Sequence, residues 1–126
     1  MVVIFDRKGF TPLYSADGDG LVGADLQGLS LNEANMIQMD LRDIDLSGAD
    51  LSQADLRLAN LRGAHFKGAN LADVDFSGAD LTGVDLTDAN LVGAVFNDVV
   101  GFDANQLASK QGITMIPVTI ESNKPV

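Results

Sequence analysis

A single histidine, His65, and the carboxylates that recur at multiples of five residues from it are the side chains best suited to chemistry in this 126-residue chain. An imidazole held between carboxylates such as Asp45 and Asp85 could support general acid-base catalysis or hold a metal ion. The chain contains no cysteine, which excludes disulfides, thiolate nucleophiles and cysteine-based zinc sites. Which of these side chains meet depends on the elements that position them.

Two short motifs resemble ligand-binding sequences but lack the surrounding elements. Residues 18–23 match the pattern G-x-G-x-x-G, yet a dinucleotide site needs a strand before the glycines and a helix after them, and here a five-residue repeat follows. Residues 17–20 look like the start of a calcium loop but lack its remaining acidic residues, so we interpret them as a turn. We therefore expect no cofactor.

One column of large apolar residues recurs every five positions, sixteen times without a gap, from Leu21 to Phe96. The residue two positions earlier is small or apolar in every repeat except the first, where Asp19 stands. Residues two apart share a face of an extended segment, so both columns must point into the interior. A helix, with a period of about 3.6 residues, does not produce this spacing, and neither does a plain strand, with a period of about 2.

The residues around the two apolar columns predict turns. Asp or Asn stands between the columns in twelve of the sixteen repeats and must point outward. Glycine stands two positions after the large apolar residue in eight repeats, and Asp, Gln or Glu in most of the others. Because these residues favour turns, each unit is a short extended piece followed by a bend. A chain that bends every five residues around one apolar column must coil, so the sequence predicts an all-β solenoid.

The repeat resembles the pentapeptide-repeat family. The family motif A-(D/N)-L-x-x is present at Ala49-Asp50-Leu51, Ala54-Asp55-Leu56, Ala59-Asn60-Leu61, Ala69-Asn70-Leu71 and Ala89-Asn90-Leu91. The resemblance covers residues 20–99 and implies a right-handed quadrilateral β-helix, with four repeats in each coil and about four coils.

Four repeats per coil would place His65 between Asp45 and Asp85 on adjacent coils, and would stack other carboxylates such as Asp25 and Asp45. Calcium prefers about six to eight oxygens from a wrapping loop, and a flat ladder offers few of them. An open face also lacks a cleft that shields a substrate from water. We therefore interpret His65 as a surface histidine and expect neither a metal site nor catalysis.

Two groups of outward residues depart from the polar pattern, and they contain the candidate protein-contact residues Ile37, Leu58, Arg42, Arg57 and Arg62. Ile37 and Leu58 are apolar where their columns are otherwise polar or small, and four-sided coils would bring them to one side on adjacent coils. They are either ordinary surface or a contact site. The second group is a basic band just after the large apolar residues: Arg42, Arg57, Arg62 and Lys67. We expect these bases to pair with neighbouring aspartates, at about 0 to 1 kcal/mol per exposed pair, and binding of an anion is the alternative.

The first nineteen residues are expected to cover one end of the solenoid. Residues 2–5 form a short strand, a turn follows, and the bulky Phe10, Leu13 and Tyr14 close the first coil. Covers are needed because the terminal coils expose an apolar cross-section and unpaired edges. We expect one domain made of an N-terminal cap at 1–19, a β-helix at 20–99 and a C-terminal cap at 100–126.

The C-terminal cap is predicted to begin with a short helix. Asp103 serves as its N-cap and Gln106 closes a capping box, and an apolar tail follows the helix. The tail either folds back on the last coil as a lid or joins two molecules. A net charge of −10 on each chain opposes self-association, so we favour the lid and a monomer over a dimer through the tail.

The charge balance indicates a cationic partner. The chain carries 18 acidic and 8 basic residues, so it repels nucleic acid and anionic membranes at long range and attracts basic proteins. No signal peptide or membrane span is visible, which favours the cytoplasm unless a leader has been removed. With one histidine, no cysteine and no pocket-forming insertion, the sequence predicts a non-enzymatic, acidic protein-interaction scaffold.

The resemblance implies one alternative function. Some members of the family resemble DNA in shape and charge and bind type II topoisomerases, and another basic nucleic-acid-binding protein is an equivalent target. Residues 20–99 carry thirteen acids and four bases, which leaves a net charge of −9. At about 4.8 Å per coil, four coils span only about 19 Å, less than one turn of a duplex, which argues against mimicry.

Overall fold

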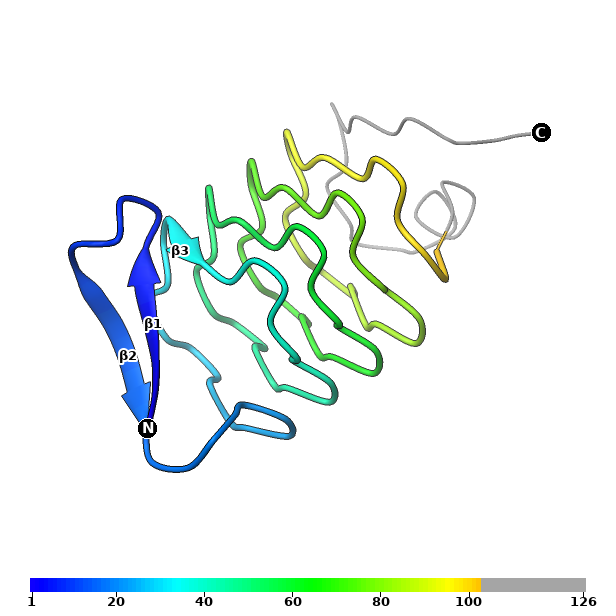
Figure 1. Ribbon diagram of the computed structural model, residues 1–126. Helices are drawn as coiled ribbons and strands as arrows, with labels where there is room; N and C mark the ends of the chain where they lie inside the picture. Colours follow the sequence, from blue (N-terminus) through cyan, green and yellow to red (C-terminus); the bar gives the residue numbers. More distant parts are fainter. Residues whose placement is uncertain (103–126) are drawn as a thin grey trace.

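The computed structural model describes residues 1–102 and shows a stack of coils closed at one end by a β-hairpin (Figure 1). Its strands are β1 at Val2–Asp6, β2 at Pro12–Ala16 and β3 at Ala34–Asn35. This part of the chain contains no helix, and hence none long and apolar enough to cross a membrane. The helix expected from Asp103 and the tail after it lie outside the described residues, so the C-terminal cap and the monomer stay predictions.

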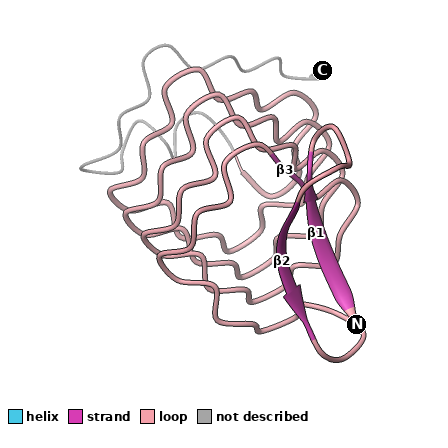
Figure 2. Ribbon diagram, turned by 90° about the vertical axis from the view of Figure 1, so that its left-hand side faces the viewer, coloured by secondary structure: helices cyan, strands magenta, loops and turns pink. Residues whose placement is uncertain are grey.

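Backbone pairing between residues twenty apart defines the coil. Single parallel bridges join Asp25 to Asp45, Asp45 to His65 and His65 to Asp85, and three further ladders in residues 1–102 follow the same spacing. One coil therefore contains four five-residue repeats, as the resemblance implied. Figure 2 shows the coils stacked behind the hairpin formed by β1 and β2.

Each coil is joined to the next by regular backbone hydrogen bonds. The N–H of Leu46 donates to the carbonyl of His65 over 2.8 Å, and the N–H of His65 donates to the carbonyl of Ile44 over 2.9 Å. The N–H of Gly48 donates to the carbonyl of Lys67 over 2.9 Å at the corner of the coil. The extended pieces are thus very short strands that hydrogen bonds along the axis join to the neighbouring coils, and a second set of bonds, such as that from the N–H of Ala49 to the carbonyl of Leu46, closes the turn within a repeat.

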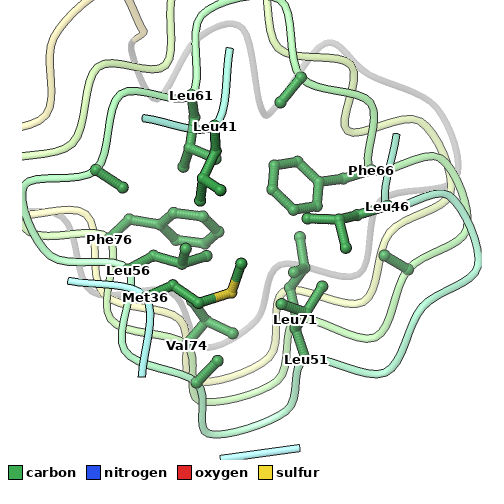
Figure 3. Close-up of a cluster of buried hydrophobic side chains, with 14 of the residues drawn as sticks. Met36, Leu41, Leu46, Leu51, Leu56, Leu61, Phe66, Leu71, Val74 and Phe76 are labelled. Carbon is green, nitrogen blue, oxygen red and sulfur yellow. The ribbon is translucent and has the colours of Figure 1, made fainter. Parts of the chain in front are cut away.

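Both predicted inward columns form the core. Leu46, Phe66 and Leu86 stack in consecutive coils, and each is at most 1% exposed, which confirms the predicted register. The smaller column is also buried at positions such as Ala64, which is 0% exposed. Figure 3 shows the large side chains pointing at one another across the centre of the coil. The interior is filled by apolar side chains, and close packing leaves no channel along the axis.

The phenylalanines of the core make a continuous aromatic column toward the C-terminal end. The ring of Phe76 lies edge-on to Phe66 with centroids 6.2 Å apart, and is stacked on Phe96 with centroids 5.1 Å apart. Phe102 is stacked on Phe96 with centroids 5.3 Å apart. Edge-to-face and offset stacked pairs are the geometries that aromatic rings prefer. Phe102 therefore covers part of the last described coil.

The corner of every repeat is a residue with positive φ, two positions after the large apolar residue. Eight of these corners are glycines with φ between 69° and 77°. The other eight have φ between 58° and 63° and are Glu33, Gln38, Asp43, Gln53, Leu58, Asp73, Asp88 and Asp98. The left-handed region is open to glycine and is tolerated by Asp and Asn, which explains most of the column. Leu58 is the one apolar residue at such a corner.

The Asp and Asn residues between the two inward columns stabilise these corners. Every one of them accepts a hydrogen bond at its Oδ1 from the backbone N–H two residues later, over 2.9–3.4 Å. Where that later residue is Ser52, Ser77, Thr82 or Thr87, its hydroxyl donates to the same oxygen. These side chains lie outward as predicted, but each folds back on its own turn. The sequence pattern did not indicate this role.

Acid should weaken the fold through these carboxylates. The side-chain hydrogen bond from Ser47 lowers the pKa of Asp45, and that from Thr82 lowers the pKa of Asp80. Because the folded-state pKa lies below the unfolded value, near 4, the stability is fully present above that value and is lost as the pH falls through the lower folded-state pKa. We expect urea unfolding to give a constant free energy of unfolding from about pH 7 to 5 and a decline from about pH 4 downward. A free energy of unfolding that increases as the pH is lowered from about 4 to 3 would contradict this prediction.

The N-terminal cap is a hairpin whose first strand continues the solenoid. β1 pairs antiparallel with β2 and, on its other edge, with β3, where Phe5 lies opposite Asn35. Ile4 is fully buried, and Leu13 and Tyr14 pack against the core as predicted. Phe10 does not: it is 84% exposed, because the turn between the strands carries it away from the coil. The expectation that Phe10 closes the first coil is wrong.

Candidate protein-interaction surface

One side of the solenoid brings the candidate residues Ile37, Arg57 and Leu58 together. We call it the Arg57 face, and it is formed by residues 35–38, 55–58, 75–78 and 95–98. A groove of about 470 Å³ follows this face across the coils. It is lined by Ile37, Gln38, Arg57, Leu58, Ser77, Gly78 and Asp98. The sequence placed Ile37 and Leu58 on adjacent coils, and the groove joins them into one surface.

Leu58 occupies its corner under two physical penalties. Its φ is 61°, a conformation that costs a residue with a Cβ about 1–2 kcal/mol. Its side chain is also 57% exposed, so burial compensates little of that strain. The side chain lies toward Gly78 on the next coil, where a Cβ would come 2.6 Å from Leu58 Cδ2. Glycine at position 78 therefore leaves room for Leu58 along the groove.

Replacing Leu58 with glycine should stabilise the fold. Glycine adopts the left-handed corner without the clash of a Cβ, and this gain exceeds the entropy that glycine adds to the unfolded chain. We expect Leu58→Gly to raise the free energy of unfolding in urea by about 0.5–1 kcal/mol. Gln53→Gly, at a corner with φ of 63°, is the matched control and should give a similar rise. A loss above about 1 kcal/mol for Leu58→Gly alone would mean that its contacts outweigh the strain.

The arginines of the basic band are engaged in ion pairs. Arg57 lies 2.7 Å from Asp55, Arg42 lies 2.8 Å from Asp40, and Arg62 reaches Asp80 on the next coil over 3.3 Å. The predicted pairing with neighbouring aspartates is thus confirmed for these three. In residues 1–102, Lys67 makes no such pair. A band neutralised in this way is a poor site for an anion.

The pair between Asp55 and Arg57 is the most buried of the three. Asp55 is 6% exposed and accepts hydrogen bonds from Arg57 Nε and Nη2 over 2.7–3.1 Å. Burial opposes ionisation of Asp55, but the hydrogen bonds from Arg57 and the nearby charge of Arg7 hold its pKa below the ordinary value. Arg57 is consequently fixed in one orientation beside the groove, and its charge is balanced there.

The His65 column forms as the resemblance implied but stands on an open face. His65 pairs through its backbone with Asp45 and Asp85, and its side chain is exposed. The carboxylate of Asp45 accepts a hydrogen bond from the N–H of Ser47 in its own turn. Within the described residues, no group of three or more His, Cys, Asp or Glu side chains is placed to hold a metal ion.

The carboxylates of the surface fall into two classes that the sequence did not separate. Those between the inward columns accept hydrogen bonds from their turns, whereas those at the corners do not. Asp43, Asp73, Asp88 and Asp98 are exposed, and in residues 1–102 none of their carboxylates makes a hydrogen bond or an ion pair. The sequence contained a signal for this difference. An acid that stands at a glycine position of the repeat is itself the corner residue, so it does not precede a turn that its carboxylate could cap. The corner acids are the charges available to a partner.

The pattern of repeats decides the family. The family profile described as pentapeptide repeats (8 copies) matches residues 21–57 and 59–98. The chain belongs to the pentapeptide-repeat family. Membership implies a right-handed quadrilateral β-helix, and the four-repeat coil of this pentapeptide-repeat protein agrees with it. The total of about four coils for the whole chain stays a prediction.

Solved structures of other pentapeptide-repeat proteins resemble this one. A pentapeptide repeat protein from Nostoc Pcc 7120 is 32% identical, with a TM-score of 0.36, over 77% of this chain and 84% of its own. One from the Arabidopsis thaliana thylakoid lumen is 25% identical, with a TM-score of 0.32, over 85% of this chain and 68% of its own. QnrB1, a plasmid-mediated fluoroquinolone resistance protein, is 21% identical, with a TM-score of 0.44, over 79% of this chain. The match spans 52% of QnrB1, about half its length, and none of these likenesses identifies a partner. Among curated proteins, none matches.

Proposed function

We propose that this pentapeptide-repeat protein is a non-enzymatic scaffold that binds a basic partner protein through its acidic outer surface. The observation that carries the proposal is the set of exposed corner carboxylates, which the fold itself does not use. The coils hold each of these charges rigidly at one of the four corners of the coil, so a cationic partner meets pre-organised negative charge on whichever side it approaches. A cytoplasmic location and a monomeric state are part of the same prediction.

A scaffold role also agrees with how the interior is used. The inward side chains fill the coil, so a substrate has no enclosed space there, and the groove on the Arg57 face is open to solvent. Side chains on such a face remain in water, where acid-base and electrostatic catalysis are weak. Proteins of the pentapeptide-repeat family are generally structural or interaction proteins.

The proposal is tested by capturing partners on the full chain at low and high salt. We expect the retained protein to be basic and to be released as the salt rises from about 0.05 M to 0.5 M, because exposed charges are screened. The variant in which all four exposed corner aspartates are replaced by asparagine should lose the partner while keeping the fold, since asparagine tolerates positive φ. Gln53→Asn, at an equivalent corner, is the control that leaves the charge unchanged. Retention that is equal at both salt concentrations would contradict the proposal.

The second candidate function is mimicry of DNA toward a type II topoisomerase or another basic nucleic-acid-binding protein. The observation in its favour is the regular repetition of carboxylates from coil to coil. The ion pairs of Arg42, Arg57 and Arg62 interrupt that pattern, which is why mimicry ranks second. A competition experiment separates the two candidate functions. If the protein mimics DNA, duplex DNA should displace it from a type II topoisomerase. A captured partner that duplex DNA leaves bound would favour the scaffold.

A further inference from the structure

We propose that the groove on the Arg57 face docks an extended segment of a partner protein that carries an apolar side chain followed, about three residues later, by a lysine or arginine. This inference rests on the proposed function and assigns the partner's chemistry to one surface. The apolar side chain would lie against Ile37 and Leu58, and the cation would pair with Asp98. Three observations support this arrangement.

The first observation is the shape and lining of the groove. Its volume of about 470 Å³ lies within the range of about 300–1,000 Å³ typical of small-molecule pockets, and so suits a few side chains. Ile37 and Leu58 supply apolar walls on adjacent coils, and Gly78 leaves room for the Leu58 side chain to lie along the groove. An apolar side chain placed there would remove Leu58 from water.

The second observation is that a leucine stands at position 58, a corner of the coil. All other corners of the repeat are glycine or a polar residue, which adopt or tolerate positive φ, whereas Leu58 is strained and 57% exposed. Strained residues persist where the surrounding structure holds them and are concentrated at binding sites. The fold gains little from this leucine, and a partner that covers it gains apolar contact.

The third observation is the charge along the groove. Arg57 is neutralised by Asp55, so it does not repel a cation. Asp98 is exposed and makes no ion pair within residues 1–102. The chain as a whole carries a net charge of −10, which favours a basic segment over an acidic one. The complementary segment therefore combines an apolar group with a cation.

The spacing between these groups follows from the coil. Leu58 and Asp98 lie two coils apart on the same face, which corresponds to about 10 Å at roughly 4.8 Å per coil. An extended peptide in the polyproline II conformation has about three residues per turn and rises about 3.1 Å per residue, so side chains three residues apart lie on the same side and about 9 Å from one another. The shortest matching probe is the tetrapeptide acetyl-Leu-Ser-Ser-Arg-amide.

The test is a titration of the full chain with that tetrapeptide, followed by methyl NMR. We expect the methyl signals of Ile37 and Leu58 to shift, and acetyl-Ala-Ser-Ser-Arg-amide and acetyl-Leu-Ser-Ser-Glu-amide to bind at least about fivefold more weakly. Leu58→Gly should weaken the tetrapeptide about tenfold, as followed by the Ile37 signals, whereas Gln53→Gly should change its affinity less than about twofold. Asp98→Asn should weaken binding about twofold to fivefold, and Asp88→Asn, on another face, should not.

Each outcome decides a different point. Equal losses for Asp98→Asn and Asp88→Asn, with none for Leu58→Gly, would overturn the groove and leave the acidic scaffold standing. Absence of binding by the tetrapeptide, while the intact protein still retains a salt-sensitive basic partner, would have the same meaning. Nuclear Overhauser contacts between Leu58 and residues 113–120 in the free protein would show that the chain fills its own groove and would overturn the proposal. If the methyl signals of Ile37 and Leu58 disappeared as the protein self-associates without peptide, the groove would bind a second copy of the chain, and the proposal would also be overturned.

Discussion

Replacing Phe76 with alanine is expected to lower the free energy of unfolding by about 3–5 kcal/mol, the range for removing a buried phenylalanine. Phe76 is 0% exposed and lies at the centre of the aromatic column, edge-on to Phe66 and stacked on Phe96. The substitution removes both ring contacts and leaves a cavity that the regular coil cannot close by a local shift. Urea unfolding followed by circular dichroism measures the change.

The matched control is Phe10→Ala in the N-terminal hairpin. Phe10 is the same residue type but is 84% exposed, so its removal should change the free energy of unfolding by less than about 0.5 kcal/mol. A small effect of Phe76→Ala would mean that the coils rearrange to fill the cavity. An effect of Phe10→Ala as large as that of Phe76→Ala would mean that Phe10 is buried in solution, and the described cap would be incomplete.

Replacing Ala64 with leucine is expected to lower the free energy of unfolding by about 1–3 kcal/mol or more, because a filled interior has no room for a larger side chain. Ala64 belongs to the smaller inward column and is 0% exposed. Its N–H donates to the carbonyl of Leu61 within the same turn, and its carbonyl accepts from the N–H of Asp85 on the next coil, so the backbone cannot move aside without losing these hydrogen bonds. The urea midpoint should fall with an unchanged slope.

Ala72→Leu is the control for this prediction. Ala72 stands just after the inward Leu71 and is only partly buried, so a larger side chain there extends along the surface. Its free energy of unfolding should stay within about 0.5 kcal/mol of the parent. If Ala64→Leu left the midpoint unchanged, the smaller column would not be interior, and the assignment of both inward columns would fail.

The candidate site was predicted in part. Ile37 and Leu58 were identified because apolar residues are unusual in outward columns, and the groove of the Arg57 face contains both. Arg57 was predicted to pair with an aspartate and does so, with Asp55. Gly78 and Asp98 were missed, because their part in the groove depends on which coils they occupy relative to Leu58. For each of these residues, a role in binding a partner protein is a proposal.

The five-residue pattern by itself determined the local structure of this protein. Leu46 and Phe66 had to be inward, and the glycines and acids two positions later had to be corners, because side-chain polarity and backbone freedom act within one repeat. The use of Asp45 and its equivalents as turn acceptors is equally local, although it became apparent only from the hydrogen bonds. These features follow from residues that are close in the chain.

Only the tertiary structure decided which outward side chains meet. Arg62 pairs with Asp80 and Leu58 lies against Gly78 because the coil closes after four repeats, which places residues about twenty apart side by side. The number of sides depends on how the large side chains fill the interior, and no single repeat contains that information. The exposure of Phe10 has a similar origin, because the hairpin attaches through the edge of β1 to β3 and its turn extends past the coil. Contacts between coils, and therefore the groove, are properties of the packed solenoid.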